Sequence, residues 1–213
     1  METRILYAVF IFSIFVYWCF NEKAGLQLGL IVLFSNWIIS IYRHLYEYLP
    51  LNINFSWIIF AVVFFGYFLL CNKIISLLSK GGFRAYMIAA AIVSFFMILY
   101  RPSLSFIINA GIFLGLCVGY CLNKRYVGFK SFDYLQRKSL VKFLTLSARF
   151  ILGLAVFVFL LFGVGKIFEI FSESQNIELI IFICYVFISL WISAAAPWVF
   201  VKIRLAGTGE QKQ

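Results

Sequence analysis

Seven long apolar runs separated by short polar segments constrain this chain more than any other feature. They cover residues 5–20, 25–41, 55–78, 85–100, 104–122, 143–168 and 179–201. A helix needs about 20 apolar residues to cross roughly 30 Å of hydrocarbon. With 64% hydrophobic and 12% charged residues, a water-soluble fold could not enclose this surface. The sequence therefore predicts an all-α, polytopic transmembrane bundle of six or seven spans, formed by residues 1–213 as a single integral membrane domain.

The distribution of lysine and arginine predicts the orientation of the spans. If there are seven, fourteen of these residues fall on one side of the membrane and only Arg4, Arg43, Arg101 and Lys166 on the other. The positive-inside rule then places the amino terminus outside and the carboxyl terminus in the cytoplasm. The basic loop 123–142 and the tail 202–213 are expected to be cytoplasmic. The loop fits either a short helix on an anionic leaflet or a solvated basic linker.

Charge and cysteine content exclude several classes of function. The net charge of +10 does not indicate nucleic acid, because the basic residues lie in short loops between apolar runs. One histidine and eight acidic residues leave few ligands for a metal. Cys117 and Cys121, one helical turn apart, are interpreted as small packing residues. We therefore expect membrane lipids as the surroundings, with no metal, cofactor or nucleic acid bound.

Small residues predict where the helices pack closely. Gly111, Gly115 and Gly119 form a stripe along one face of a single span, which suits close helix–helix contact. Packing within the chain is favoured over a homodimer face. Pro197 follows an alanine run inside an apolar segment, so we expect a kink or an early helix end there.

A few polar and aromatic groups fall inside or at the ends of the spans. Asn36 and Asn109 lie deepest and are expected to make helix–helix hydrogen bonds. Arg149 lies near the end of its span, from which its long side chain could reach the headgroup region. The tryptophans, among them Trp18 and Trp198, lie mostly near span ends, as expected of interfacial anchors.

Four stretches resemble a known family. "YWCFNEKAGLQLGLIVLFSNWIISIYRHLYEYLP" resembles the opening of a bacterial branch of the type 2 phosphatidic acid phosphatase superfamily. "AGIFLGLCVGYCLNKRYVGF", "ARFILGLAVFVFLLFGVGKIF" and "LWISAAAPWVFVKIRLA" follow in the order of the carboxyl-terminal part of that branch. The resemblance covers more than half of the chain. It implies a phosphatidic-acid-phosphatase-like helical core with a C-terminal helix extension in the bacterial inner membrane, with the phosphate-site loops facing outward.

The family's catalytic signatures are not retained in this sequence. In the first, Arg43 could replace the lysine and Pro50 the proline, but no arginine precedes Pro50. Residues 54–57 read Asn-Phe-Ser-Trp where the family has Pro-Ser-Gly-His. In the third, the positions of the arginine, the histidine and the aspartate are occupied by Met97, Ser103 and Ile107. The family's covalent mechanism needs that histidine and carboxylate, so we expect no catalytic residues.

The resemblance and its departures together suggest a catalytically inactive relative. We expect a membrane-embedded subunit or scaffold of a larger assembly, bound to a membrane protein partner or to a second copy of itself. The alternative is a protein that binds the headgroup of a lipid phosphate or isoprenoid phosphate through Arg43, His44 and Arg101, since guanidinium groups bind phosphate bidentately. An active phosphatase with diverged motifs is less favoured.

Overall fold

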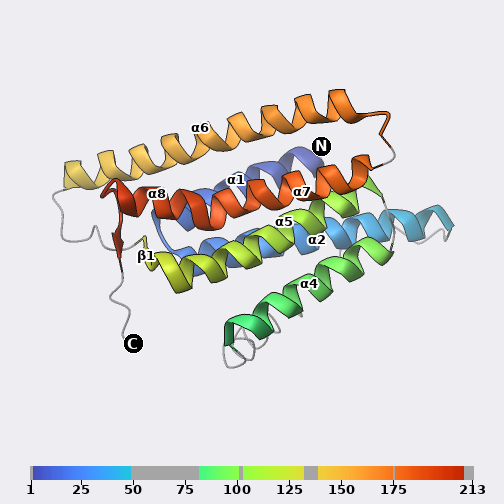
Figure 1. The fold of residues 1–213 in the computed structure, drawn as a ribbon, viewed down its shortest axis with the longest axis horizontal. Helices are drawn as coiled ribbons and strands as arrows, with labels where there is room; N and C mark the ends of the chain where they lie inside the picture. The colour runs from blue at the N-terminus through green and yellow to red at the C-terminus, as the bar shows by residue number, and fades with distance from the viewer. Residues whose placement is uncertain (1, 49–81, 101–102, 132–138, 175, 209–213) are drawn as a thin grey trace.

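The chain folds into helices that run along a common long axis (Figure 1). The computed structural model describes residues 2–48, 82–100, 103–131, 139–174 and 176–208. The elements in chain order are α1 (Glu2–Cys19), α2 (Glu22–Tyr48), α4 (Gly82–Tyr100), α5 (Leu104–Leu122), the π-helical η1 (Asn123–Val127), β1 (Phe129–Lys130), α6 (Ser139–Phe171), α7 (Ile177–Leu190), the π-helical η2 (Trp191–Ala195), α8 (Ala196–Lys202) and β2 (Gly207–Thr208). The predicted all-α bundle is confirmed. The two-residue β1–β2 pair is an addition that the sequence pattern did not predict.

Within the described part of the chain, three helical stretches are long and apolar enough to span a membrane: Leu104–Val127, Leu140–Phe171 and Ile177–Lys202. The helices over Ala8–Cys19 and Ala85–Tyr100 are apolar but shorter. Six of the seven predicted runs fall on α1, α2, α4, α5, α6 and the continuous α7–η2–α8 helix. The run 55–78 lies outside the described residues, so the count of seven spans stays a prediction.

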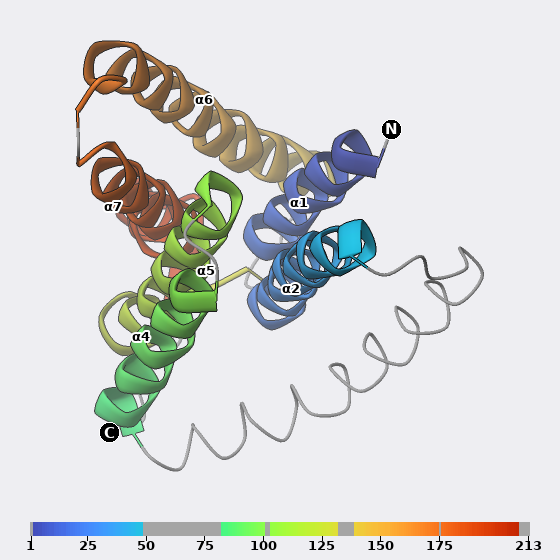
Figure 2. The ribbon, with the colours of Figure 1, turned by 90° about the vertical axis from the view of Figure 1, so that its right-hand side faces the viewer.

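Helix α5 lies at the centre of the described bundle, in contact with α7, α4 and α2 (Figure 2). Helices α1 and α2 form a tight hairpin, because the Asn21 side chain accepts hydrogen bonds from the first backbone N–H groups of α2. The hairpin also needs Gly25, where a Cβ would overlap the backbone of Tyr17. Helix α6 contacts α1 and α7, but only 11% of its apolar 18-residue stretch is buried inside the bundle.

The glycine stripe of α5 lies against α7 and η2. A Cβ added at Gly111 would lie 2.8 Å from the Phe182 carbonyl oxygen. At Gly115 a Cβ would overlap the Val186 carbonyl oxygen, and at Gly119 it would overlap the hydroxyl of a serine in η2. Because they lack a Cβ, these residues let the two backbones approach closely. The stripe therefore faces a helix of the same chain.

Pro197 is accommodated by side chains of α1. An N–H at position 197 would donate to the carbonyl of Ile192 in π register or of Ser193 in α register, and proline has none. Instead, the Trp18 indole N–H donates to the Ile192 carbonyl at 2.8 Å, and the Tyr17 hydroxyl donates to the Ser193 carbonyl at 2.8 Å. The helix continues through η2 into α8, so the expected early end is wrong. Trp18, which is fully buried, is not an interfacial anchor.

Arg149 joins three distant parts of the chain. Its side chain is 1% exposed. Nε donates to the Leu205 carbonyl at 2.9 Å, and Nη1 donates to the carbonyls of Trp18 and Ser131, both at 3.3 Å. Nη2 also donates to the Leu205 carbonyl. The expectation that this side chain reaches toward the headgroups is therefore wrong. Its several donors instead serve carbonyls at the end of α1, after β1 and after α8.

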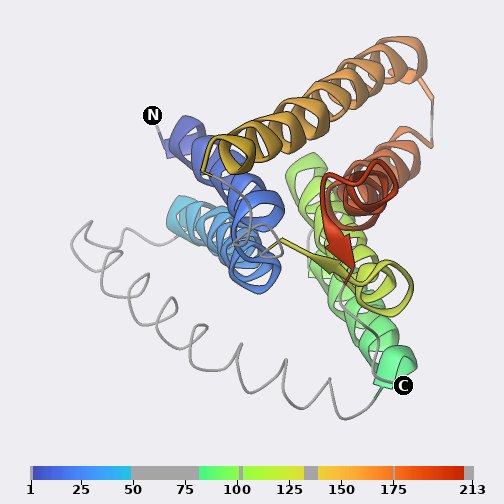
Figure 3. The same ribbon diagram turned by 90° about the vertical axis from the view of Figure 1, so that its left-hand side faces the viewer.

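The turn after α8 has an unusual residue at its centre. The Arg204 N–H donates to Val201 and the Leu205 N–H donates to Phe200, at 3.0 and 2.8 Å, which is the Schellman pattern. Arg204 has a φ of 59°, a conformation that glycine adopts freely and that costs another residue about 1 kcal/mol. The turn presents the Leu205 carbonyl to Arg149 and leads into β2, which pairs antiparallel with β1 (Figure 3).

Charge differs between the two ends of the bundle. Cations of the described residues gather where α1, α5 and α8 end and α2 and α6 begin: Lys23, Lys124, Arg125, Lys130, Lys142, Lys202 and Arg204. Near the turn between α6 and α7, at the opposite end, lie Glu169, Glu173 and Glu178, with Lys166 in an ion pair of 2.7 Å with Glu169. Basic side chains thus gather at one end, the same pattern on which the predicted orientation rests.

Tyr17 and Pro197 should be energetically coupled. Tyr17→Phe should lower the free energy of unfolding by about 1–2 kcal/mol, because it removes the donor to the Ser193 carbonyl. In a Pro197→Ala background the loss should shrink by about 1 kcal/mol, since a new N–H can serve that carbonyl. A double-mutant cycle by unfolding in mixed detergent micelles measures the coupling. As a control, the effects of Tyr17→Phe and Lys166→Ala should be additive. If Tyr17→Phe lowers the free energy of unfolding equally with proline and with alanine at position 197, the interpretation of Pro197 is contradicted.

Arg149→Met should lower the free energy of unfolding by about 3 kcal/mol, because it leaves buried carbonyls without donors. The same unfolding measurement checks this expectation. Lys166→Met is the matched control: it removes an exposed cation from an exposed ion pair and should change the free energy by less than about 0.5 kcal/mol. If the two substitutions have equal effects, the contacts of Arg149 do not stabilise the fold.

Candidate functional site

The residues expected to hold a lipid phosphate belong to the end of α2 and to the connection between α4 and α5. Arg101 lies outside the described residues. Arg43 and His44 belong to the last turns of α2, and their side chains also lie outside what the structure describes. Nearby, the rings of Trp37 on α2 and Tyr100 at the end of α4 lie 6.4 Å apart. This contact places the middle of α2 beside the end of α4, and it leaves the positions of the Arg43, His44 and Arg101 side chains untested.

A layer of polar groups crosses the bundle near this end. Asn36 on α2 donates through Nδ2 to Asn109 Oδ1 on α5 at 3.1 Å, which confirms the expected helix–helix hydrogen bond. Asn109 and Ser94 are 3% and 2% exposed. Three buried donors, Asn109 Nδ2, Ser94 Oγ and Trp37 Nε1, have no hydrogen-bond partner in the described structure. Buried polar groups are rarely left without a hydrogen-bond partner.

The described positions of the third family signature hold side chains that cannot do its chemistry. Met97 on α4 is 1% exposed and Ile107 on α5 is 3% exposed, both within the bundle. Ser103 precedes α5 without a side-chain cap bond. Pro50 and residues 54–57 lie outside the described residues. Where described, the third signature is thus occupied by a thioether, a hydroxyl and a hydrocarbon side chain, and none of these carries a charge or acts as a general base at neutral pH.

The described residues contain no group of three or more histidine, cysteine or acidic side chains that could hold a metal ion. Cys117 is buried in the core and Cys121 lies partly exposed one turn further along α5. At the α6–α7 end, the described Lys166–Glu169 pair is exposed on one helix. Within these residues, we find no nucleophile beside a base and an orienting carboxylate, the arrangement that covalent catalysis needs.

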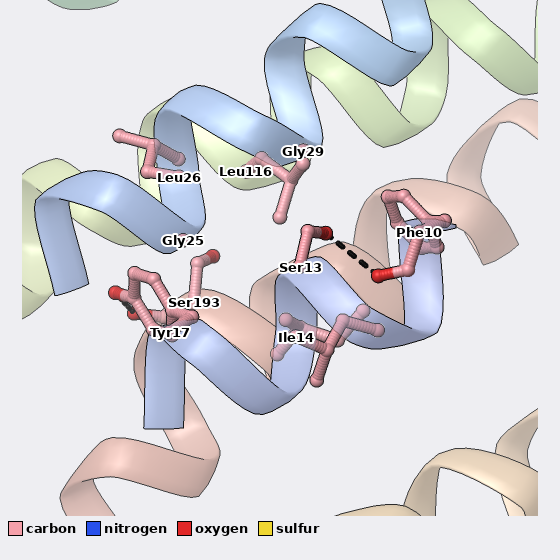
Figure 4. Close-up of a pocket in the computed structure, with 10 residues that line it drawn as sticks. Phe10, Ser13, Ile14, Tyr17, Gly25, Leu26, Gly29, Leu116 and Ser193 are labelled. Carbon is pink, nitrogen blue, oxygen red and sulfur yellow. Dashed lines mark hydrogen bonds between the residues drawn. The ribbon is translucent and has the colours of Figure 1, made fainter. Parts of the chain in front are cut away.

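A small cavity between α1, α2, α5 and η2 lies beside the π-helical segment (Figure 4). Gly25 and Gly29 leave space on the α2 side, and Ser13, Tyr17 and Ser193 line the other. Their hydroxyls are already engaged: Ser13 Oγ donates to the Phe10 carbonyl at 2.6 Å, and the others donate to carbonyls of η2, α5 or α7. The cavity is therefore a packing defect beside satisfied polar groups and offers no acid–base pair.

Sequence reasoning missed the buried network that holds α1 against the carboxyl-terminal helices. Asn123 donates from Nδ2 to the Tyr17 hydroxyl at 3.0 Å, and its Oδ1 accepts from the Phe129 N–H at 3.4 Å. Pro197 was the available signal, because a proline inside a span leaves carbonyls that need other donors. The sequence alone did not indicate which segment supplies them.

The comparison with protein families finds one match. Residues 107–208 match the family described as PAP2 superfamily phosphatase, transmembrane extension. The match runs from α5 to β2, covers just under half of the chain, and contains the glycine stripe, Arg149 and Pro197. Neither the curated proteins nor the solved structures yield a match to this chain. Residues 107–208 are thus similar to the transmembrane extension of PAP2 superfamily phosphatases, which agrees with the resemblance found in the sequence.

Proposed function

We propose that this lipid phosphatase-like membrane protein is catalytically inactive and acts as a membrane-embedded subunit or scaffold. The observation that carries the proposal is the burial of Met97 and Ile107 at the positions where the resemblance calls for an arginine and an aspartate. A buried thioether and a buried hydrocarbon cannot bind phosphate oxygens or orient a histidine. Losing one member of a catalytic unit already lowers the rate by several powers of ten, and here several are replaced.

The subunit role is supported by α6. Its outer surface carries large exposed apolar side chains, including Phe159 at 75% and Phe162 at 73% exposed. Gly163 and Gly165 follow, and a Cβ added at either would meet nothing within 4 Å. An exposed helical glycine costs about 1 kcal/mol relative to alanine, whereas close approach of another membrane helix needs such residues. The occupant of this surface is a transmembrane helix of a partner protein or of a second copy.

Two outcomes are expected from the purified full chain. It should release no phosphate from lipid phosphates or isoprenoid pyrophosphates above a heat-treated control. In mild detergent it should be recovered with a stoichiometric membrane protein partner or as a homo-oligomer, and Gly163→Leu should reduce that recovery severalfold by blocking close approach. Val158→Leu, on the same helix, is the matched control and should not.

Either of two results would refute the proposal. If the wild type hydrolyses these substrates and His44→Ala abolishes the hydrolysis, the protein is an active phosphatase with a rebuilt site. Recovery of the lone chain, never with a partner or second copy, would remove the subunit role.

Headgroup binding is the second candidate, supported by the buried donors Trp37 Nε1, Ser94 Oγ and Asn109 Nδ2, which have no hydrogen-bond partner in the described structure. If Arg43 and Arg101 bind a lipid phosphate bidentately, then Arg43→Ala and Arg101→Ala should each reduce retention of phosphatidic acid by about tenfold, read by mass spectrometry of the purified protein. Arg4→Ala, expected on the same face, should retain the lipid. Equal retention by all three variants would exclude this candidate.

A further inference from the structure

A second surface, at the opposite end of the bundle from the carboxyl-terminal ends of α2 and α4, carries its own chemistry. We call it the basic face and define it by Lys124, Arg125, Lys130, Lys202 and Arg204. Its residues come from segments that the fold holds together, because α8 contacts η1 and β1, and β1 pairs with β2. Five cations thus belong to one folded unit, in which the ends of α5–η1 and of α7–η2–α8 come together (Figure 1).

Arg204 places a charged side chain at a backbone position that is strained for any residue other than glycine. The residue has a φ of 59° at the position of a Schellman turn where glycine is strongly favoured. Its side chain is exposed, so burial does not offset the strain. Strained residues of this kind concentrate at functional positions.

Aromatic rings accompany the cations. The Lys202 ammonium lies 4.8 Å from the centre of the Trp198 ring, and the Arg125 guanidinium lies 5.4 Å from the centre of the Tyr126 ring. Trp198 is 50% exposed and Tyr126 is 67% exposed. Exposed tryptophan and tyrosine beside basic residues at helix ends are typical of the headgroup level of a membrane.

Among the residues that the structure describes, Glu22 is the acidic group near this face, and it is engaged in a hydrogen bond. Glu22 accepts a hydrogen bond of 2.9 Å from Ser131 Oγ. Three glutamates of the described structure, Glu169, Glu173 and Glu178, belong to the opposite end, around the α6–α7 turn. The basic face therefore presents a positive field beside a lipid-facing aromatic rim.

We propose that the basic face binds the phosphate groups of anionic phospholipids in the adjoining leaflet. Nucleic acid or an acidic protein would meet the same charge, but neither would make use of aromatic side chains at the headgroup level. The proposal is independent of the function proposed above, because it concerns the other end of the molecule and other residues.

The test compares lipid binding by variants of the full chain in detergent. Fluorescent phosphatidylglycerol is titrated against the wild type and against a Lys202→Gln, Arg204→Gln double variant. We expect affinity to fall by roughly tenfold or more in the double variant, and the preference for phosphatidylglycerol over phosphatidylcholine to weaken at high salt. An Arg4→Gln, Lys166→Gln double variant removes the same charge from the other end and should stay within about twofold.

Arg204→Gly distinguishes the effect of the charge on lipid binding from its effect on the stability of the fold. It relieves the positive φ, so the variant should melt at a higher temperature than the wild type while binding phosphatidylglycerol more weakly. Unchanged affinity in both this variant and the glutamine double variant would overturn the proposal. So would a wild type that prefers a single-stranded oligonucleotide of equal charge to phosphatidylglycerol.

Discussion

A carbonyl oxygen that loses its helical partner inside hydrocarbon has no water to bind, and this constraint underlies the contacts around α1, α6 and α8. Pro197 frees carbonyls in η2, and the ends of α1 and α8 free others. Tyr17, Trp18 and Arg149 supply the missing donors from side chains that are themselves buried. One requirement therefore explains why a tryptophan and an arginine lie in the interior of a membrane protein.

Much of the architecture could be predicted from the sequence, because the length of an apolar run and its flanking charges are local properties. The interhelical bond of Asn36 and Asn109 could be predicted as well, since a polar amide inside a span needs a partner. The roles of Trp18 and Arg149 could not, because residues at span ends are often interfacial. Their true partners lie up to 174 positions away in the chain, and no local pattern encodes such a pairing.

For the candidate phosphate site, the sequence predicted only the segments in which it would lie. The resemblance located its segments, and whether they meet stays a prediction, because Arg101 and the side chains of Arg43 and His44 lie outside the described residues. The buried donors around Asn109 were not predicted, because burial depends on how α2, α4 and α5 pack together. The family match, in turn, begins at residue 107, so it concerns the supporting helices and leaves out most of the segments in which the phosphate signatures would fall.

The pairing of α1 with η2 has a consequence for biogenesis. Tyr17 and Trp18 are translated long before Ile192 and Ser193, which lie 174 to 176 positions later along the chain. The first helix must therefore wait in the bilayer with its indole and phenol groups served by temporary partners, such as lipid carbonyls or a chaperone. Closure of the bundle is a late event, and an insertion intermediate that ends before α8 should be exposed to quality-control proteases along α1.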